Sequence, residues 1–152
     1  MEVKKAYKTF RYTASLAWAG GRNGTASAAG KQVISVGSPP DFRGEEGVWS
    51  PEHLFASSLS TCLMLTFLAM AERRAIEVAA YTSTAEALLE NVDGKYQVTM
   101  VTVHSQITLK SADSLDAARE IMHRVEANCF ISNSIKSKID LQADLRVAPA
   151  QP

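Results

Sequence analysis

The chain has 152 residues, enough for one domain with a hydrophobic core of its own. Its 16 Lys and Arg residues balance 16 Asp and Glu residues, and this formal net charge of zero argues against nucleic acid and acidic membrane faces as partners. A hydrophobic share of 46% against a charged share of 21% is typical of a globular protein and argues against a disordered chain.

Two extended runs are predicted over residues 7–36, on either side of a tight turn at residues 20–24. This turn contains an Asn-Gly pair flanked by further glycines, which is a strong signal for a β-hairpin. Residues 37–47 hold two adjacent prolines and three glycines, which predict a long surface loop. A loop of this length is a candidate lid or pocket wall.

A long helix is predicted over residues 50–74. Ser50 can cap it, Pro51 suits its first position, and Glu52 complements the positive end of the helix dipole. The middle of this segment is apolar on most of its circumference, and such a helix is buried within a fold or between subunits.

A second hairpin is predicted from extended runs over residues 76–90 and 96–110, joined at an Asp-Gly turn. A second helix over residues 114–126 and a last strand over residues 139–147 complete the pattern. The order β-β-α-β-β-α-β predicts a single α+β domain over residues 1–152, with mainly antiparallel sheets and a long buried central helix.

The two cysteines, Cys62 and Cys129, lie far apart and outside any C-x-x-C motif, and the three histidines are scattered, so no zinc site is predicted. The start of the chain has no apolar run of the signal-peptide type, and we expect no stretch to approach the roughly 18 apolar residues of a membrane span. We therefore expect a cytoplasmic protein with no membrane partner, in which this cysteine pair is reduced, redox-active or buried.

Cys62 falls in the middle of the apolar helix and permits two interpretations. Cysteine in a helix often serves only as a small hydrophobic residue. A reactive role requires the thiolate, and an apolar setting disfavours the thiolate unless a cation lies close. The spacing does not tell which arginine would supply that cation, and both Arg22 and Arg43 are candidates.

Three motifs resemble those of the OsmC/Ohr family of organic hydroperoxide reductases. The helix sequence SPEHLFASSLSTC ends at Cys62, the sequence NCFISNS surrounds Cys129, and the hairpin sequence GGRNG contains Arg22. Together they span most of the chain in the family's order. Phe130 replaces the proline common after the second cysteine, and the loop at residues 38–47 matches neither main branch closely, so the branch (OsmC, Ohr or a third) stays open.

This resemblance implies an organic hydroperoxide reductase without metal or organic cofactor. Cys62 corresponds to the peroxidatic thiolate and Cys129 to the resolving thiol, which form an intramolecular disulfide after a sulfenic acid. Arg22 corresponds to the cation that activates the thiolate, and Glu52 to the carboxylate that holds this arginine. The implied partners are an organic hydroperoxide and a dithiol or lipoyl-protein reductant.

A homodimer follows from the helix geometry and is also implied by the resemblance. Glu52 and Cys62 are ten residues apart, hence about 15 Å along a helix axis, and cannot share a compact pocket directly. Antiparallel contact between two copies of the helix would bring the cysteine of one chain towards the glutamate of the other. We therefore expect an intertwined homodimer with its active sites at the interface.

Large apolar residues near Cys62 favour an alkyl or lipid hydroperoxide over hydrogen peroxide. The predicted substrate pocket consists of Phe42, Trp49, Phe55, Leu59 and Leu63. Two other functions remain open. One is an OsmC-like stress-associated or small-molecule-binding protein with little turnover, and the other is a dimeric interaction module whose cysteines are both buried in the core.

Overall fold

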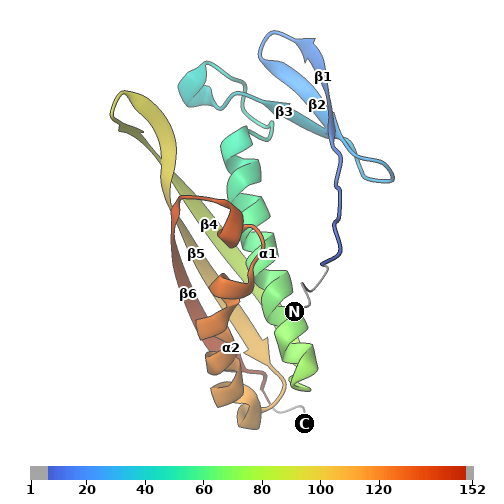
Figure 1. Ribbon diagram of the computed structural model, residues 1–152, viewed down its shortest axis with the longest axis vertical. Helices are drawn as coiled ribbons and strands as arrows, with labels where there is room; N and C mark the ends of the chain where they lie inside the picture. Colours follow the sequence, from blue (N-terminus) through green and yellow to red (C-terminus); the bar gives the residue numbers. More distant parts are fainter. Residues whose placement is uncertain (1–6, 150–152) are drawn as a thin grey trace, which may run out of the picture. The chain divides into compact units, whose positions relative to one another are not determined.

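The computed structural model describes residues 7–149, and Figure 1 shows its helices and strands. The α-carbon contacts divide the chain into two compact units, Met1–Pro51 and Glu52–Pro152, and each unit contains one three-stranded sheet. Two sheets together with two long helices confirm the predicted α+β class. That residues 1–152 form one domain stays a prediction.

The first unit contains a small antiparallel sheet. Strand β1 (Ser15–Gly20) pairs with β2 (Asn23–Ser27), which pairs in turn with β3 (Ile34–Gly37). The sequence predicted only two extended runs here. The second run is divided because the chain reverses at Gly30, whose φ of 70° lies in the left-handed region that glycine adopts most easily.

The β1–β2 hairpin confirms the predicted turn. Gly20 and Gly21 have φ values of 107° and 53°, and glycine is the residue that takes such angles without steric cost. Arg22 follows directly, in the turn just before β2. The long loop after β3 contains a short 3-10 turn at Pro40–Phe42, and Arg43 closes that turn with a φ of 62°.

The second unit is built on a long hairpin. Strands β4 (Val78–Val92) and β5 (Lys95–Leu109) are antiparallel, and Asp93 and Gly94 at their turn have φ values of 52° and 81°. Strand β6 (Lys138–Val147) pairs with β5 in parallel. Helix α2 (Leu115–Asn128) makes that parallel pairing possible, because it carries the chain back along the sheet between β5 and β6.

Helices α1 (Pro51–Arg73) and α2 cover the same face of this sheet. The buried residues of β5 alternate along the strand, as expected where one face of a strand meets the core. The fully buried side chains of the two helices pack against that face. They include Leu59, Leu63 and Phe67 from α1 and Ala118, Ile121 and Val125 from α2.

Helix α1 is long and apolar enough to cross a membrane, by length and composition alone. The expectation that no stretch approaches such a span is therefore wrong for this helix. The core helix of a water-soluble protein meets the same criteria. Leu59, Leu63 and Phe67 have no exposed surface because they form the centre of the core, which accounts for part of the apolar composition of α1.

Candidate active site

The fold brings the two cysteines of the chain together within the second unit. Cys62 lies half-buried in the middle of α1, and Cys129 is fully buried at the C-terminal end of α2. Both belong to the same packed cluster, and Cys62 lies near enough to contribute to the raised pKa of the Cys129 thiol. Both cysteines are free thiols in this structure.

The surroundings of Cys129 favour its protonated form. Burial raises the pKa of the Cys129 thiol above its usual range, and the neighbouring Cys62 acts in the same direction. Hydrogen bonding from Ser132 opposes this shift. Cys129 is therefore a neutral thiol at pH 7, whereas Cys62 is the cysteine with exposed surface.

The segment after α2 folds around the thiol of Cys129. The backbone N–H of Ser132 donates to Sγ of Cys129 at 3.4 Å, and that of Asn133 donates to the Cys129 carbonyl at 3.1 Å. The hydroxyl of Ser134 donates to the Phe130 carbonyl at 2.6 Å. The side chain of Phe130, next to Cys129, is 82% exposed.

A cavity of about 750 Å³ opens beside Cys62, between α1 and the end of α2. Its wall combines apolar, small polar and cationic side chains. They are Leu54, Ser57, Ser58, Thr61, Cys62, Leu65, Thr66, Ala69, Met70, Arg73, Arg124, Asn128 and Phe130. A ligand in this cavity would lie against the half-buried thiol and not against the buried one.

The predicted pocket residues occupy other places. Leu59 and Leu63 are fully buried in the core and do not line the cavity at Cys62, because they lie on the opposite side of α1, against the sheet. Phe55 is partly buried and packs on the same core. Phe42 and Trp49 belong to the first unit, where they are 42% and 47% exposed.

Sequence reasoning missed the residues that do line the cavity, among them Leu65, Arg73 and Arg124. A signal for part of this set was present. Positions three, four, seven, eight and eleven residues after Cys62 fall on its side of a helix, and they are Leu65, Thr66, Ala69, Met70 and Arg73. Nothing in the sequence indicated that Arg124 would join them from α2.

Glu52 lies in the first turn of α1, outside the cavity at Cys62. It lines a separate space of about 570 Å³ together with His53 and residues of β4 and β5. Its Oε2 atom is buried and has no hydrogen-bond partner among the described residues. A buried carboxylate oxygen of this kind is costly unless a donor reaches it.

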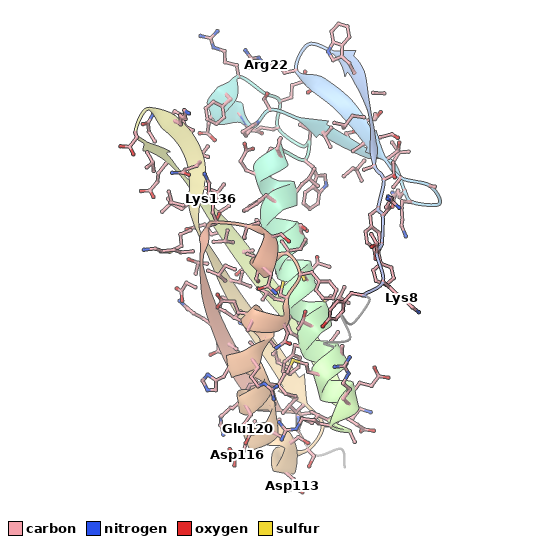
Figure 2. All side chains as sticks on the ribbon, in the orientation of Figure 1. Lys8, Arg22, Asp113, Asp116, Glu120 and Lys136 are labelled. Atoms are coloured by element: carbon pink, nitrogen blue, oxygen red, sulfur yellow. The ribbon has the colours of Figure 1, made fainter. Side chains whose placement is uncertain are left out.

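Arg22 belongs to the first unit and is labelled in Figure 2. Its guanidinium donates to the carbonyl of Phe42 at 3.1 Å, so the hairpin and the long loop are joined through this side chain. One Arg22–Phe42 bond leaves most of the five N–H donors of the guanidinium available. Arg22 and Arg43 are both candidates for the cation that favours the thiolate of Cys62.

The part of the chain that the structure describes contains no candidate metal site. Across residues 7–149, no three His, Cys, Asp or Glu side chains are grouped so that they could hold an ion. His104 instead lies 3.1 Å from the carboxylate of Asp144, and His123 lines a further cavity of about 850 Å³ beside β6.

Comparison with known proteins identifies a matching family and proteins of similar sequence. The family model for OsmC-like proteins matches residues 44–144. The uncharacterized protein YmaD of Bacillus subtilis is 24% identical over 134 residues, which are 86% of this chain and 89% of that protein. The peroxiredoxin OsmC of Escherichia coli is 24% identical over 105 residues, which are 69% of this chain and 72% of that protein.

Solved structures share the fold. An OsmC-like protein of unknown function from Vibrio cholerae has a TM-score of 0.82 at 26% identity, covering 90% of this chain and 100% of that one. An organic hydroperoxide resistance protein from Elizabethkingia anophelis has a TM-score of 0.70 at 19% identity, with 94% and 100% covered. The chain is therefore similar both to proteins named as a peroxiredoxin or an organic hydroperoxide resistance protein and to proteins without an assigned function.

Proposed function

The chain belongs to the OsmC-like protein family, and we propose that it is a thiol-dependent peroxidase that reduces organic hydroperoxides to alcohols. The observation that carries the proposal is that Cys62 and Cys129, which are distant in sequence, pack in the same cluster, where Cys62 contributes to the raised pKa of Cys129. One free thiol that lines an open cavity, with a second, buried free thiol packed in the same cluster, is an arrangement that suits a peroxidatic and a resolving cysteine.

The first step is attack by the Cys62 thiolate on the O–O bond of the hydroperoxide ROOH. Sulfur forms a bond to one oxygen, the O–O bond breaks, and the other oxygen leaves as an alkoxide that takes up a proton. Counted from the thiol, Cys62–SH and ROOH give the sulfenic acid Cys62–SOH and the alcohol ROH. Sulfur is oxidised by two electrons and the peroxide is reduced by two.

The second step uses the buried thiol. The thiolate of Cys129 attacks the sulfur of Cys62–SOH, an S–S bond forms, and the hydroxyl departs as water once it is protonated. The proximity of the two thiols would make this step faster than oxidation of the sulfenic acid by a second peroxide. An external dithiol, such as a lipoyl group on a protein, would then reduce the disulfide by two exchange steps and become a cyclic disulfide itself.

Arg22 is the proposed cation that favours the Cys62 thiolate and orients the peroxide. A guanidinium suits this role because it keeps its charge and presents several donors in a fixed plane. Glu52 is the proposed carboxylate that holds the arginine, and its buried unpartnered oxygen is a suitable acceptor. Since Glu52 does not line the cavity at Cys62, we propose that the working site is completed in a homodimer.

Turnover of cumene hydroperoxide with dihydrolipoamide as reductant tests the function. We expect turnover by the wild-type protein, none by Cys62→Ser, and a clear preference for cumene hydroperoxide over hydrogen peroxide. Comparable turnover of the two peroxides would contradict the organic preference. Absence of turnover with either would contradict the enzyme assignment.

A second candidate is a small-molecule-binding protein of the same fold with little peroxidase turnover. It is favoured by Phe130, which stands where the family commonly has proline and presents an 82% exposed aromatic ring beside Cys129. The same turnover assay, combined with a titration of bound ligand, separates the two functions.

A further inference from the structure

The short turn after α2 directs one backbone N–H at the sulfur of Cys129. The N–H of Asn133 donates to the carbonyl of Cys129 at 3.1 Å. The N–H of Ser134 donates to the carbonyl of Ile131 at 2.9 Å. The N–H of Ser132 instead donates to Sγ of Cys129 at 3.4 Å. A hydrogen-bond donor therefore already contacts the sulfur atom that joins the disulfide in the proposed reaction.

The hydroxyl of the same serine has no use in the reduced protein. The Oγ atom of Ser132 is buried and has no hydrogen-bond partner among residues 7–149. The hydroxyl of Ser134 differs, because it donates to the carbonyl of Phe130. A buried hydroxyl without a partner costs free energy and is unusual in a folded protein. We therefore expect an acceptor for the Ser132 hydroxyl to arise in another state of the protein.

Both groups of Ser132 act on the ionisation of Cys129. Burial is the main cause that raises the pKa of the Cys129 thiol, and Cys62 on α1 is the titratable group that adds to the rise. Hydrogen bonding by the side chain and the backbone of Ser132 lowers this pKa. No charged side chain within residues 7–149 is among the groups that change it. Neutral donors, and not a cation, are thus what the described chain offers to a thiolate at this position.

We infer that Ser132 stabilises the thiolate of Cys129 with two donors, its backbone N–H and its hydroxyl, while this thiolate attacks the sulfenic acid of Cys62. The inference rests on the proposed function, of which the attack is the second step. A hydroxyl hydrogen rotates to suit its acceptor, so the thiolate can accept from this group as soon as it forms.

The step is balanced in atoms and charge. The thiol of Cys129 gives up one proton, and the departing hydroxyl of Cys62–SOH takes up one proton and leaves as water. The S–O bond breaks and the S–S bond forms in its place. Ser132 gains and loses no atom, because it only donates hydrogen bonds to the attacking sulfur.

Two opposing effects determine how much the hydroxyl accelerates the attack. A hydrogen bond to a charged group increases the population of the thiolate about ten-fold or more. A thiolate of lower pKa is also a weaker nucleophile, and this offsets roughly half of the gain on a logarithmic scale. The hydroxyl of Ser132 should therefore accelerate the attack about three-fold at pH 7, where the protonated form of Cys129 predominates.

Three substitutions separate the hydroxyl from the fold of this segment. Ser132→Ala removes the hydroxyl and keeps the backbone N–H. Ser134→Ala is the matched control, since it removes a nearby hydroxyl that donates to a carbonyl and not to the sulfur. Ser132→Thr retains a hydroxyl at this position and should behave as the wild type does.

NMR titration of isotope-labelled Cys129 measures the inferred role without any peroxide. In the Cys62→Ser background Cys129 is the one remaining cysteine, so its ionisation is observed alone. Ser132→Ala should move the midpoint of this titration upward by about one pH unit, whereas Ser134→Ala and Ser132→Thr should leave it nearly unchanged. An unchanged midpoint in Ser132→Ala, or an equal rise in Ser134→Ala, would overturn the inference.

Single-turnover kinetics with Cys62 intact connect the donor to the reaction. Ser132→Ala should slow the disappearance of Cys62 sulfenic acid about three-fold at pH 7. The preceding reaction of Cys62 with cumene hydroperoxide should keep its wild-type rate. Equal slowing of both steps would contradict the inference, because it would indicate a change in the fold around both cysteines.

Failure of this inference is distinguishable from failure of the function on which it rests. A raised midpoint in Ser132→Ala, for a protein that consumes no hydroperoxide, would support Ser132 as a donor to the thiolate and contradict the proposed function. Wild-type turnover together with an unchanged lifetime of the sulfenic acid in Ser132→Ala would support the function and overturn the inference.

Discussion

Cys62, in the middle of α1, and Cys129, directly after α2, pack in the same cluster, and Cys62 contributes to the raised pKa of the Cys129 thiol. They differ in their surroundings, since Cys62 is half-buried beside a cavity and Cys129 has no exposed surface. This difference assigns separate tasks to them in the proposed reaction. Cys62 meets the peroxide, and Cys129 meets only Cys62.

Disulfide formation should depend on pH through the ionisation of Cys129. Burial raises the pKa of this thiol, so its reactive thiolate form is scarce at pH 7 and increases as the pH rises. The rate at which preformed Cys62 sulfenic acid disappears should therefore increase from pH 7 to pH 9. Stopped-flow measurement after one equivalent of peroxide checks this, and a rate that falls over that range would contradict it.

Substitution of the two candidate cations should have unequal effects. Arg22→Gln should slow the reaction of Cys62 with cumene hydroperoxide by about ten-fold or more, because it removes the guanidinium proposed to orient the peroxide, and a hydrogen bond from a charged group contributes at least that factor. Arg43→Gln, an arginine of the same unit, is the control and should react nearly as the wild type does. The reverse order in single-turnover kinetics would transfer the role to Arg43.

Core packing gives a prediction that is independent of function. Leu63→Ala should lower the free energy of unfolding by about 2–5 kcal/mol, because Leu63 has no exposed surface and its truncation leaves a cavity between α1 and the sheet. Leu65→Ala on the same helix is the control. Leu65 is 55% exposed, so urea unfolding should show a clearly smaller loss for this variant, and equal losses would contradict the described packing.

The proposed assembly predicts a stable dimer. Sedimentation velocity at micromolar concentration should give a single species of about twice the chain mass of 16.5 kDa. Enzymatic activity should be lost when dilution dissociates it, because Glu52 lies apart from the Cys62 cavity. A monomer with full activity would contradict the shared site.

The fold was largely predictable because its signals are local. Glycines at residues 20 and 21, the Asp93-Gly94 pair and the apolar periodicity of α2 each determine structure within a few residues. The third strand of the first sheet was missed because it depends on the turn at Gly30. Parallel pairing of β6 with β5 follows from tertiary packing of α2, which no local pattern records.

The candidate site was predictable only in part, because only some of its signals are local in the sequence. Motifs indicated Cys62 and Cys129 as candidates, and their role stays a prediction, whereas periodicity alone could not tell which side of the apolar helix α1 faces the sheet. Leu59 and Leu63 were therefore assigned to the pocket although they form the core, and Leu65 was overlooked. The place of Arg124 depends on how α2 packs on α1, and this contact is not encoded in either helix alone.

The most direct test of the account is the state of the two thiols after one equivalent of cumene hydroperoxide. Mass spectrometry of the wild-type protein should show loss of both free thiols and a peptide pair joined by a Cys62–Cys129 disulfide, which a dithiol reverses. Cys62→Ser should keep its remaining thiol, and Cys129→Ser should accumulate a sulfenic acid at Cys62. Two unchanged thiols in the wild-type protein would contradict the account and indicate that both cysteines serve only the core.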